Sequence, residues 1–328
     1  MLSVIRERLF ADDCAIMAHT IEHIQLLTDC FAKAAKRFGL KINLKKTEVL
    51  FQSTSFPVSY KPTVTIDNTP LNVVDKFCYL GSVLSRNADI SDDIGRRIGA
   101  ACAAFGKLEA RLWKSRDIKL ATKVAVYKAV VLPTLLHGCE SWTLYRRHIH
   151  SLDKFHLRCL LHIARIKWQD KVPNTDVLKR CNITGIEAMI MHSQLRWAGH
   201  LTRMPDHRIP KIVFYSKLQH GARPRGHPKM RYKDNLKASL LSAGTDTSCW
   251  ESAASSRTTW RSTCFKGVSS FEEQRIDLAI QKRHRRKDPS KSLSTQSTQL
   301  VCAICERRCS AKIGLMSHMR THNTGSRR

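Results

Sequence analysis

The N-terminal part of the chain alternates between short apolar runs and polar turns. Apolar runs at 9–11 and 14–17 flank two acidic residues, Asp12 and Asp13. An apolar run, a polar pair and a second apolar run predict a strand, a tight turn and a second strand. The pattern therefore places both carboxylates at the tip of a hairpin.

A longer amphipathic stretch follows this hairpin. Between residues 21 and 38 the apolar positions fall three or four apart, which is the period of one helix face, and Gly39 is a typical helix stop. Further short apolar runs bounded by turn residues predict strands and hairpins. The predicted strands are 41–44, 49–51, 64–66, 71–74 and 77–81.

Beyond residue 90 the pattern becomes mostly helical. Ser91 is expected to cap a helix whose apolar stripe reaches Leu112, and a second helix at 118–131 is expected to stop before Pro133. Two further helices are predicted near 150–163 and 186–202. After residue 205 order is expected to weaken.

The charge balance points to a polyanionic partner. The chain has 328 residues with 56 Lys and Arg against 27 Asp and Glu, a formal net charge of +29. Such a surplus favours RNA or DNA as partner, ahead of an anionic membrane surface. No apolar run is long enough to span a bilayer, and the start does not resemble a secretory signal, so we expect a nuclear or cytoplasmic protein that is not secreted.

Four metal-ligating residues stand close together near the C-terminus. Cys302 and Cys305 are separated by two residues, and His318 and His322 lie one helical turn apart. Two thiolates and two imidazoles can close a tetrahedron around one structural zinc ion. The spacing resembles that of the C2H2 zinc finger. Cys309 stands where that family has an aromatic residue, and it is either a small core residue, which we favour, or a competing ligand.

This finger is not expected to read bases. Its usual base-contacting positions hold Ala311, Gly314 and Ser317, whose side chains cannot form the bidentate contacts of Arg, Asn or Gln. We expect phosphate contacts instead, and a finger that binds protein is the alternative. The proposed phosphate-contacting residues are Arg307, Arg308, Lys312 and Arg320.

The paired aspartates belong to a longer order of motifs. Residues 10–13, 39–47 and 79–81 follow one another in an order that resembles the palm of reverse transcriptases from LINE-type, non-LTR retrotransposons. The resemblance implies that Asp12 and Asp13 are a metal-binding pair. It also implies that 39–47 is the following motif with its lysine, and that 79–81 is the hairpin that grips the primer.

The resemblance extends over most of the chain. Residues 90–143 are similar to the thumb of that group, and 195–200 with the basic loop behind them are similar to the region beyond the thumb. The implied fold class is α+β, with a partial palm, a mainly helical thumb and post-thumb region, and one ββα zinc finger. The expected domains are a truncated palm at 1–89, a helical region at 90–205, a basic, weakly ordered region at 206–289, a polar linker at 290–300 and the finger at 301–323.

The expected function is that of a nucleic-acid-binding remnant. The family's first palm aspartate lies upstream of the aspartate pair and has no counterpart here, so we expect the pair to be an inactive relic and magnesium to matter only in a competent polymerase. The alternatives are a polymerase completed by a segment supplied in trans, a zinc-finger DNA-binding regulator and an unfolded product. Outside the finger, the proposed nucleic-acid contacts are Lys45, Lys46, Arg223, Arg225 and Lys229.

Two further residue sets are candidates for binding roles. His156, Cys159 and His162 could share a helix face, and core packing or phosphate contact is expected rather than a second zinc site. The tryptophans are expected mostly in the core, with base stacking as the alternative for any one of them. They are Trp113, Trp142, Trp168, Trp197, Trp250 and Trp260.

Overall fold

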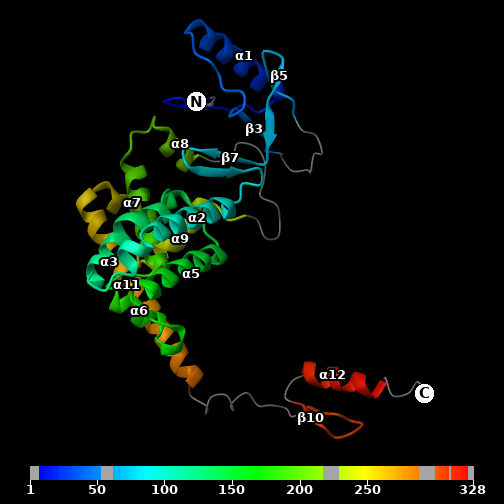
Figure 1. The fold of residues 1–328 in the computed structure, drawn as a ribbon, viewed down its shortest axis with the longest axis vertical. Coiled ribbons are helices and arrows are strands. Elements are labelled where there is room, and N and C mark those ends of the chain that lie inside the picture. The colour runs from blue at the N-terminus through cyan, green and yellow to red at the C-terminus, as the bar shows by residue number, and fades with distance from the viewer. Residues whose placement is uncertain (1–6, 53–61, 217–228, 288–299, 310–311, 324–328) are drawn as a thin grey trace. The chain divides into compact units, whose positions relative to one another are not determined.

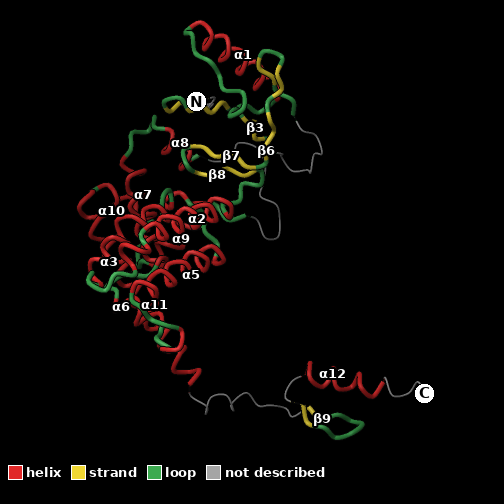
Figure 2. The backbone as a smooth tube through the Cα atoms, viewed as in Figure 1, coloured by secondary structure: helices red, strands yellow, loops and turns green. Residues whose placement is uncertain are grey.

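The computed structural model combines helices with small two-stranded sheets, in keeping with an α+β class (Figure 1, Figure 2). The structure describes residues 7–52, 62–216, 229–287, 300–309 and 312–323. The chain divides into two compact units, Met1–Phe271 and Glu272–Arg328. None of the described helices combines the length and the apolar character that a membrane-spanning helix needs.

The predicted N-terminal hairpin is confirmed. Strands β1 (Glu7–Phe10) and β2 (Asp13–Ile16) pair antiparallel around a turn at Ala11 and Asp12. Helix α1 (Ile21–Arg37) follows, and the Thr20 hydroxyl caps it by accepting a hydrogen bond from the backbone of His23.

The strand expected at 41–44 is wrong. This segment leads into a turn, because the Asn43 side-chain oxygen accepts hydrogen bonds from the backbone N–H groups of Lys45 and Lys46, at 3.1 and 3.3 Å. Such a side-chain to backbone bond competes with strand pairing. The turn thus presents two lysines in succession at the surface.

Short strands complete the first part of the chain. β3 pairs parallel with β6, while β4–β5 and β7–β8 are antiparallel hairpins. The turn at 67–68 matches the sequence pattern, whereas residues 80–81, expected to end a strand, form the turn between β7 and β8. Val64, Ile66 and Leu71 form a small core with apolar residues of α1. The bounds are β3 (Glu48–Leu50), β4 (Thr65–Ile66), β5 (Thr69–Pro70), β6 (Asn72–Val74), β7 (Lys76–Tyr79) and β8 (Ser82–Ser85).

A larger core joins the helices that follow. Trp113, Tyr127, Leu152 and Leu160 are among its fully or nearly fully buried side chains. Two π-helical turns, η1 (Glu109–Trp113) and η2 (Tyr127–Val131), continue α2 and α3. The helices are α2 (Ser91–Lys107), α3 (Leu120–Val126), α4 (Leu132–Leu135), α5 (Arg146–Ile163), α6 (Asn174–Arg180) and α7 (Ile186–Arg203), with 3-10 turns η3 (Cys139–Ser141) and η4 (Trp168–Asp170).

Two predicted helix boundaries are wrong. Ser91 is the first helical residue rather than the cap, since Ile90 precedes it at the cap position and the Ser91 hydroxyl bonds to the side chains of Asp89 and His148. The helix before Pro133 does not stop there. Pro133 lies in α4, which follows the π-helical turn η2 without a break, so the helical run passes the proline although its missing N–H cannot donate to the preceding turn.

The described part of 206–289 is helical, which differs from the expected weak order. Its helices are α8 (Ile209–Tyr215), α9 (Tyr232–Ser242), α10 (Trp250–Ser255) and α11 (Arg257–Lys287). These helices share a second hydrophobic core, which includes Leu240, Trp250 and Trp260. Each buried tryptophan removes a large apolar area from water, and this stabilises helices that the basic sequence alone does not indicate. The loop predicted at 221–229 and the linker at 290–300 lie almost wholly outside the described residues.

The backbone of α7 comes close to α11 at one glycine. A β-carbon added to Gly199 would lie 2.2 Å from the Trp260 indole, whose ring nitrogen donates to the carbonyl oxygen of Leu195 at 2.9 Å. The helix therefore needs a residue without a side chain at this position.

A buried carboxylate connects the hairpin β7–β8 to the helices. Asp93 in α2 accepts hydrogen bonds from the backbone of Val83 in β8, at 3.0 Å, and from the Trp142 indole, at 3.1 Å. The Arg97 guanidinium lies 3.7 Å from the same carboxylate. Asp93 is only 4% exposed, so these partners replace the water that a charge requires.

Replacing Asp93 should destabilise the protein far more than replacing its neighbour. Asp93→Ala leaves the N–H groups of Val83 and Trp142 buried without this acceptor, and we expect unfolding free energy to fall by about 3 kcal/mol. Asp92→Ala removes an exposed ion pair with Lys76 and should cost about 1 kcal/mol or less. Urea denaturation of both variants measures the difference, and equal losses would contradict the role given to Asp93.

Candidate metal centre and nucleic-acid interface

Four side chains converge in the C-terminal unit. Strands β9 (Leu300–Val301) and β10 (Arg308–Cys309) pair antiparallel, and the turn between them carries Cys302 and Cys305. Helix α12 (Lys312–Asn323) carries His318 and His322 four residues apart. The potential ligand atoms of all four residues lie within 4.8 Å of one another.

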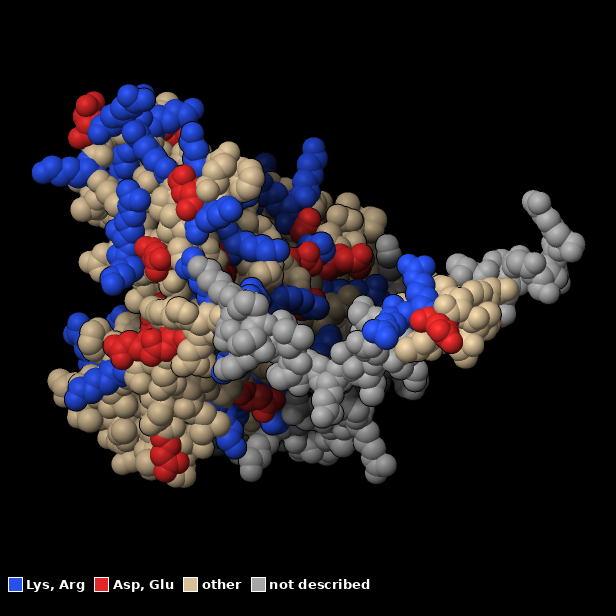
Figure 3. Space-filling model, turned by 90° about the horizontal axis from the view of Figure 1, so that it is seen from below, with Lys and Arg blue, Asp and Glu red and all other residues tan. Residues whose placement is uncertain are grey.

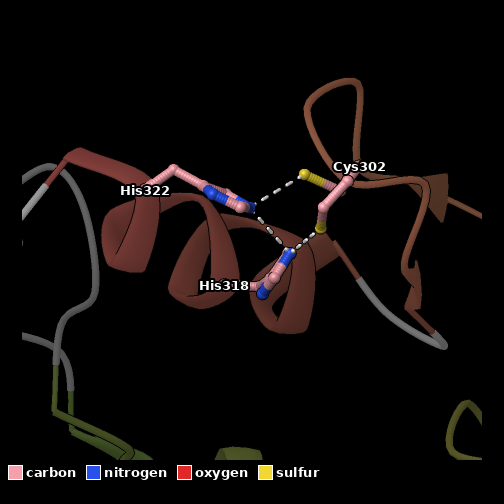
Figure 4. Close-up of side chains that lie close together, drawn as sticks. Cys302, His318 and His322 are labelled. Atoms are coloured by element: carbon pink, nitrogen blue, oxygen red, sulfur yellow. Dashed lines mark hydrogen bonds between the residues drawn. The ribbon is translucent and has the colours of Figure 1, made fainter. Parts of the chain in front are cut away.

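The close-up shows the side chains of Cys302, His318 and His322 pointing toward one another (Figure 4). The Cys305 sulfur lies 2.9 Å from Nε2 of His318, and the Cys302 sulfur lies 3.5 Å from Nε2 of His322. The two Nε2 atoms are 3.1 Å apart. Two sulfur and two nitrogen donors around one point are compatible with a tetrahedral zinc site.

The local electrostatics favour the metal-binding protonation states. Backbone N–H groups, led by that of Ile304, lower the pKa of the Cys302 thiol by stabilising the thiolate. Desolvation and the neighbouring His322 lower the pKa of His318, which favours its neutral form. Thiolate sulfur and neutral imidazole are the forms that coordinate zinc.

Cys309 does not join this group. It lies in β10, half-buried, and among the described residues the converging ligand set consists of the other two cysteines and the two histidines. The interpretation of Cys309 as a small packing residue fits its position. Of the base-contacting positions, Gly314 and Ser317 are exposed on α12, and Ala311 lies outside the described residues.

The metal site makes a direct prediction. The full chain should bind one zinc ion, and Cys305→Ser should weaken zinc binding by on the order of 100-fold or more because a thiolate ligand is lost. Cys309→Ser is the matched control and should keep full binding. Metal analysis and the visible spectrum of the cobalt-substituted protein measure both. Loss of the metal in Cys309→Ser would make that residue a ligand.

The aspartate pair stands at an exposed hairpin. Asp12 lies in the turn and Asp13 begins β2. The Tyr79 hydroxyl donates to the carbonyl oxygen of Arg8 at 3.1 Å, which ties this hairpin to β7. In the described part of the chain, no third Asp, Glu, Cys or His joins the pair, because the converging group of three or more such residues there is the C-terminal one.

The predicted basic contacts are only partly described. Lys45 and Lys46 are exposed on their turn, Lys229 donates to the backbone oxygen of Asn87, and Arg307 and Arg308 are exposed beside the metal ligands. Figure 3 shows many lysine and arginine side chains on the visible face, with several acidic side chains among them. Arg223 and Arg225, and the side chains of Lys312 and Arg320, lie outside the described part.

The histidines and the cysteine of α5 have partners other than a metal. His156 is fully buried and its Nδ1 lies 2.9 Å from the Tyr127 hydroxyl, while His162 lies 3.0 Å from the carboxylate of Glu109. Burial raises the pKa of the Cys159 thiol to about 12, so the thiolate that a metal needs is disfavoured. These side chains serve packing and hydrogen bonding.

Sequence reasoning missed one buried cation. Lys123 is almost fully buried, and its ammonium donates to the carbonyl oxygens of Trp113 and Ser115 at 3.0 and 2.6 Å. Arg165 donates to Lys114 and Ser115 at 2.8 Å each. The two cations cap the carbonyl end of a helical segment, and nothing in the local pattern signals this long-range contact.

Relatives of this chain come from mobile elements. A transposon-derived protein of Caenorhabditis elegans is 25% identical over 258 residues, which cover 76% of this chain and 92% of the relative. The RNA-directed DNA polymerase of the X-element transposon of Drosophila melanogaster is 28% identical over 246 residues. That of the mobile element jockey of Drosophila funebris is 22% identical over 240 residues.

The matches to the two polymerases cover most of this chain but only a small part of each polymerase. Each covers 71% of this chain, whereas the chain spans about a quarter of each polymerase, 23% and 25% of their lengths. No family model matches the chain. No solved structure matches it either.

Proposed function

We propose that this chain binds RNA or DNA and derives from the reverse transcriptase of a non-LTR retrotransposon. The supporting observation is the similarity to two RNA-directed DNA polymerases over 71% of the chain. The net charge of +29 supports the same proposal, because a phosphate backbone is the polyanion that such a surface attracts. The protein would act in the nucleus or the cytoplasm.

The proposed parts follow the domains expected from the sequence. The hairpin β1–β2 with Asp12 and Asp13 is the palm-like element, and β7–β8 with Tyr79 is the primer-grip-like hairpin. Helices α2 to α7 are the thumb-like and post-thumb region. The Asp93 network supports this arrangement, since it joins the second hairpin to the first of these helices.

Binding would rest on the phosphate backbone. Lys45, Lys46 and Lys229 supply cations in the first unit, and Arg307 and Arg308 supply them beside the metal ligands. The lysine ammonium and arginine guanidinium groups bind phosphate oxygens, and such contacts do not distinguish one base from another. The proposed zinc ion holds the small C-terminal unit in shape and takes no part in chemistry.

The proposal predicts steeply salt-dependent binding. Anisotropy titrations of duplex DNA and structured RNA with the full chain should show affinity falling by on the order of 1000-fold between about 50 and 200 mM salt. Lys45→Ala should reduce the slope against salt by about one unit. Lys237→Ala, an exposed lysine of α9 outside the proposed contacts, is the charge-matched control and should leave the slope unchanged. Affinity that does not change with salt would contradict the proposal.

The aspartate pair is proposed to be catalytically silent in this chain. Two-metal polymerisation needs carboxylates that hold both magnesium ions, and among the described residues no third one comes together with Asp12 and Asp13. Primer extension assays with magnesium should therefore give no product from the chain alone. Extension that Asp12→Ala abolishes and Asp92→Ala preserves would instead make the chain a polymerase, with the pair as magnesium ligands.

A further inference from the structure

One tryptophan stands apart from the rest of the aromatic core. Trp168 is 83% exposed, whereas Trp113, Trp142, Trp250 and Trp260 are each less than 10% exposed. Trp197 is half-buried. An indole is the largest apolar side chain, and Trp168 in water forgoes the burial that the four buried tryptophans obtain. A single exposed apolar side chain is common on protein surfaces, so the case for a partner rests on the residues around Trp168.

The turn that carries Trp168 is fixed at both ends. Ile166 before it and Val172 after it pack against the helical core. Within the turn, the Asp170 carboxylate accepts a hydrogen bond from the backbone N–H of Lys167 at 2.8 Å. Arg165 and Lys171 have φ angles of +55° and +49°, so the chain bends sharply on either side. The indole is therefore presented on a rigid support, which lowers the entropic cost of binding.

Basic residues precede and follow Trp168 in the sequence. Lys167 and Lys171 flank the turn, both exposed, and Arg165 is anchored by its bonds to the carbonyl oxygens of Lys114 and Ser115. The single acidic residue between them, Asp170, is engaged with the backbone. The buried Lys123 lies near Arg165, and burial with this neighbour lowers the pKa of Lys123. The local field thus favours an anion.

We propose that Trp168 stacks on a base of single-stranded RNA or DNA while Lys167 and Lys171 hold the adjacent phosphates. The proposal rests on the nucleic-acid binding proposed above and names a residue that grips an unpaired base. A flat aromatic surface accepts any base, and flanking cations supply the phosphate contacts. Bases in a duplex are already stacked on their neighbours, so the indole selects single strands. The two exposed lysines that flank the indole in sequence, Lys167 and Lys171, favour a polyanion over a protein surface.

Binding of the full-length chain tests the stacking directly. Anisotropy titrations use oligo-uridine, oligo-thymidine and a blunt duplex, so that RNA, DNA and paired bases are separate arms. Trp168→Ala should weaken binding to the single strands about tenfold and leave duplex affinity unchanged. Trp168→Phe keeps a stacking face and should retain most of the affinity. Phe265→Ala, which removes another exposed aromatic ring, is the control and should change nothing.

A second measurement locates the contact. Ultraviolet crosslinking of the wild-type chain to an oligonucleotide with 5-iodouridine should attach the label to the peptide that contains Trp168, as mass spectrometry reports. A label that is found only on other peptides would overturn the proposal. Equal loss of single-strand and duplex affinity in Trp168→Ala would overturn it as well.

The outcomes separate this proposal from the function it rests on. If the wild-type chain binds none of the three ligands, nucleic-acid binding itself fails. If it binds and Trp168→Ala binds single strands as well as wild type, stacking fails while nucleic-acid binding stands. The exposed indole would then be a contact for a protein partner.

Discussion

The buried carboxylate of Asp93 joins three segments of the chain: β8, α2 and the segment around Trp142. It accepts hydrogen bonds from Val83 in β8 and from Trp142 beyond α4, and it lies in α2 itself. A buried charge is tolerated only when its partners are present together, so the hairpin, the helix and the segment around Trp142 must assemble as one unit. The hairpin β7–β8 is thereby held against α2 by a polar contact.

Trp142 also connects the Asp93 network to helices of the second hydrophobic core. The carbonyl oxygen of Trp142 accepts a hydrogen bond from Gln194 of α7 at 2.9 Å and one from Asn235 of α9 at 3.4 Å. Helix α7 takes part in both cores, with Ile190 in the first and Leu195 in the second. A change at Asp93 therefore reaches helices that it does not touch, because Trp142 is shared between the two sets of contacts.

Local patterns predicted what depends on neighbours in sequence. The hairpin at Asp12 and the helices α1, α5 and α7 follow from the apolar periods of strands and helices. The four metal ligands lie within twenty positions of one another in the sequence. The predictions that failed depend on contacts with residues that the local pattern does not bring together. The Ser91 hydroxyl bonds to Asp89 and to His148, which is 57 residues away, and does not cap α2. The Lys123 ammonium is buried against carbonyl groups that no local pattern connects to it. Exposure of Trp168 was equally invisible, since the sequence does not show which apolar residue remains outside the core.

The two units depend on different forces. The first buries large aromatic side chains and a polar network, whereas in the C-terminal unit Ile304, Ile313 and Met316 are exposed and Cys302 is buried. The few side chains buried among the described residues of this small unit do not offset the conformational entropy lost on folding. Binding of a metal ion would supply the missing free energy of folding. In our proposal, loss of zinc therefore removes the fixed presentation of Arg307 and Arg308 without disturbing the Asp93 network. Nucleic-acid binding by the first unit would then persist, with its affinity reduced by the contacts that the C-terminal unit no longer makes.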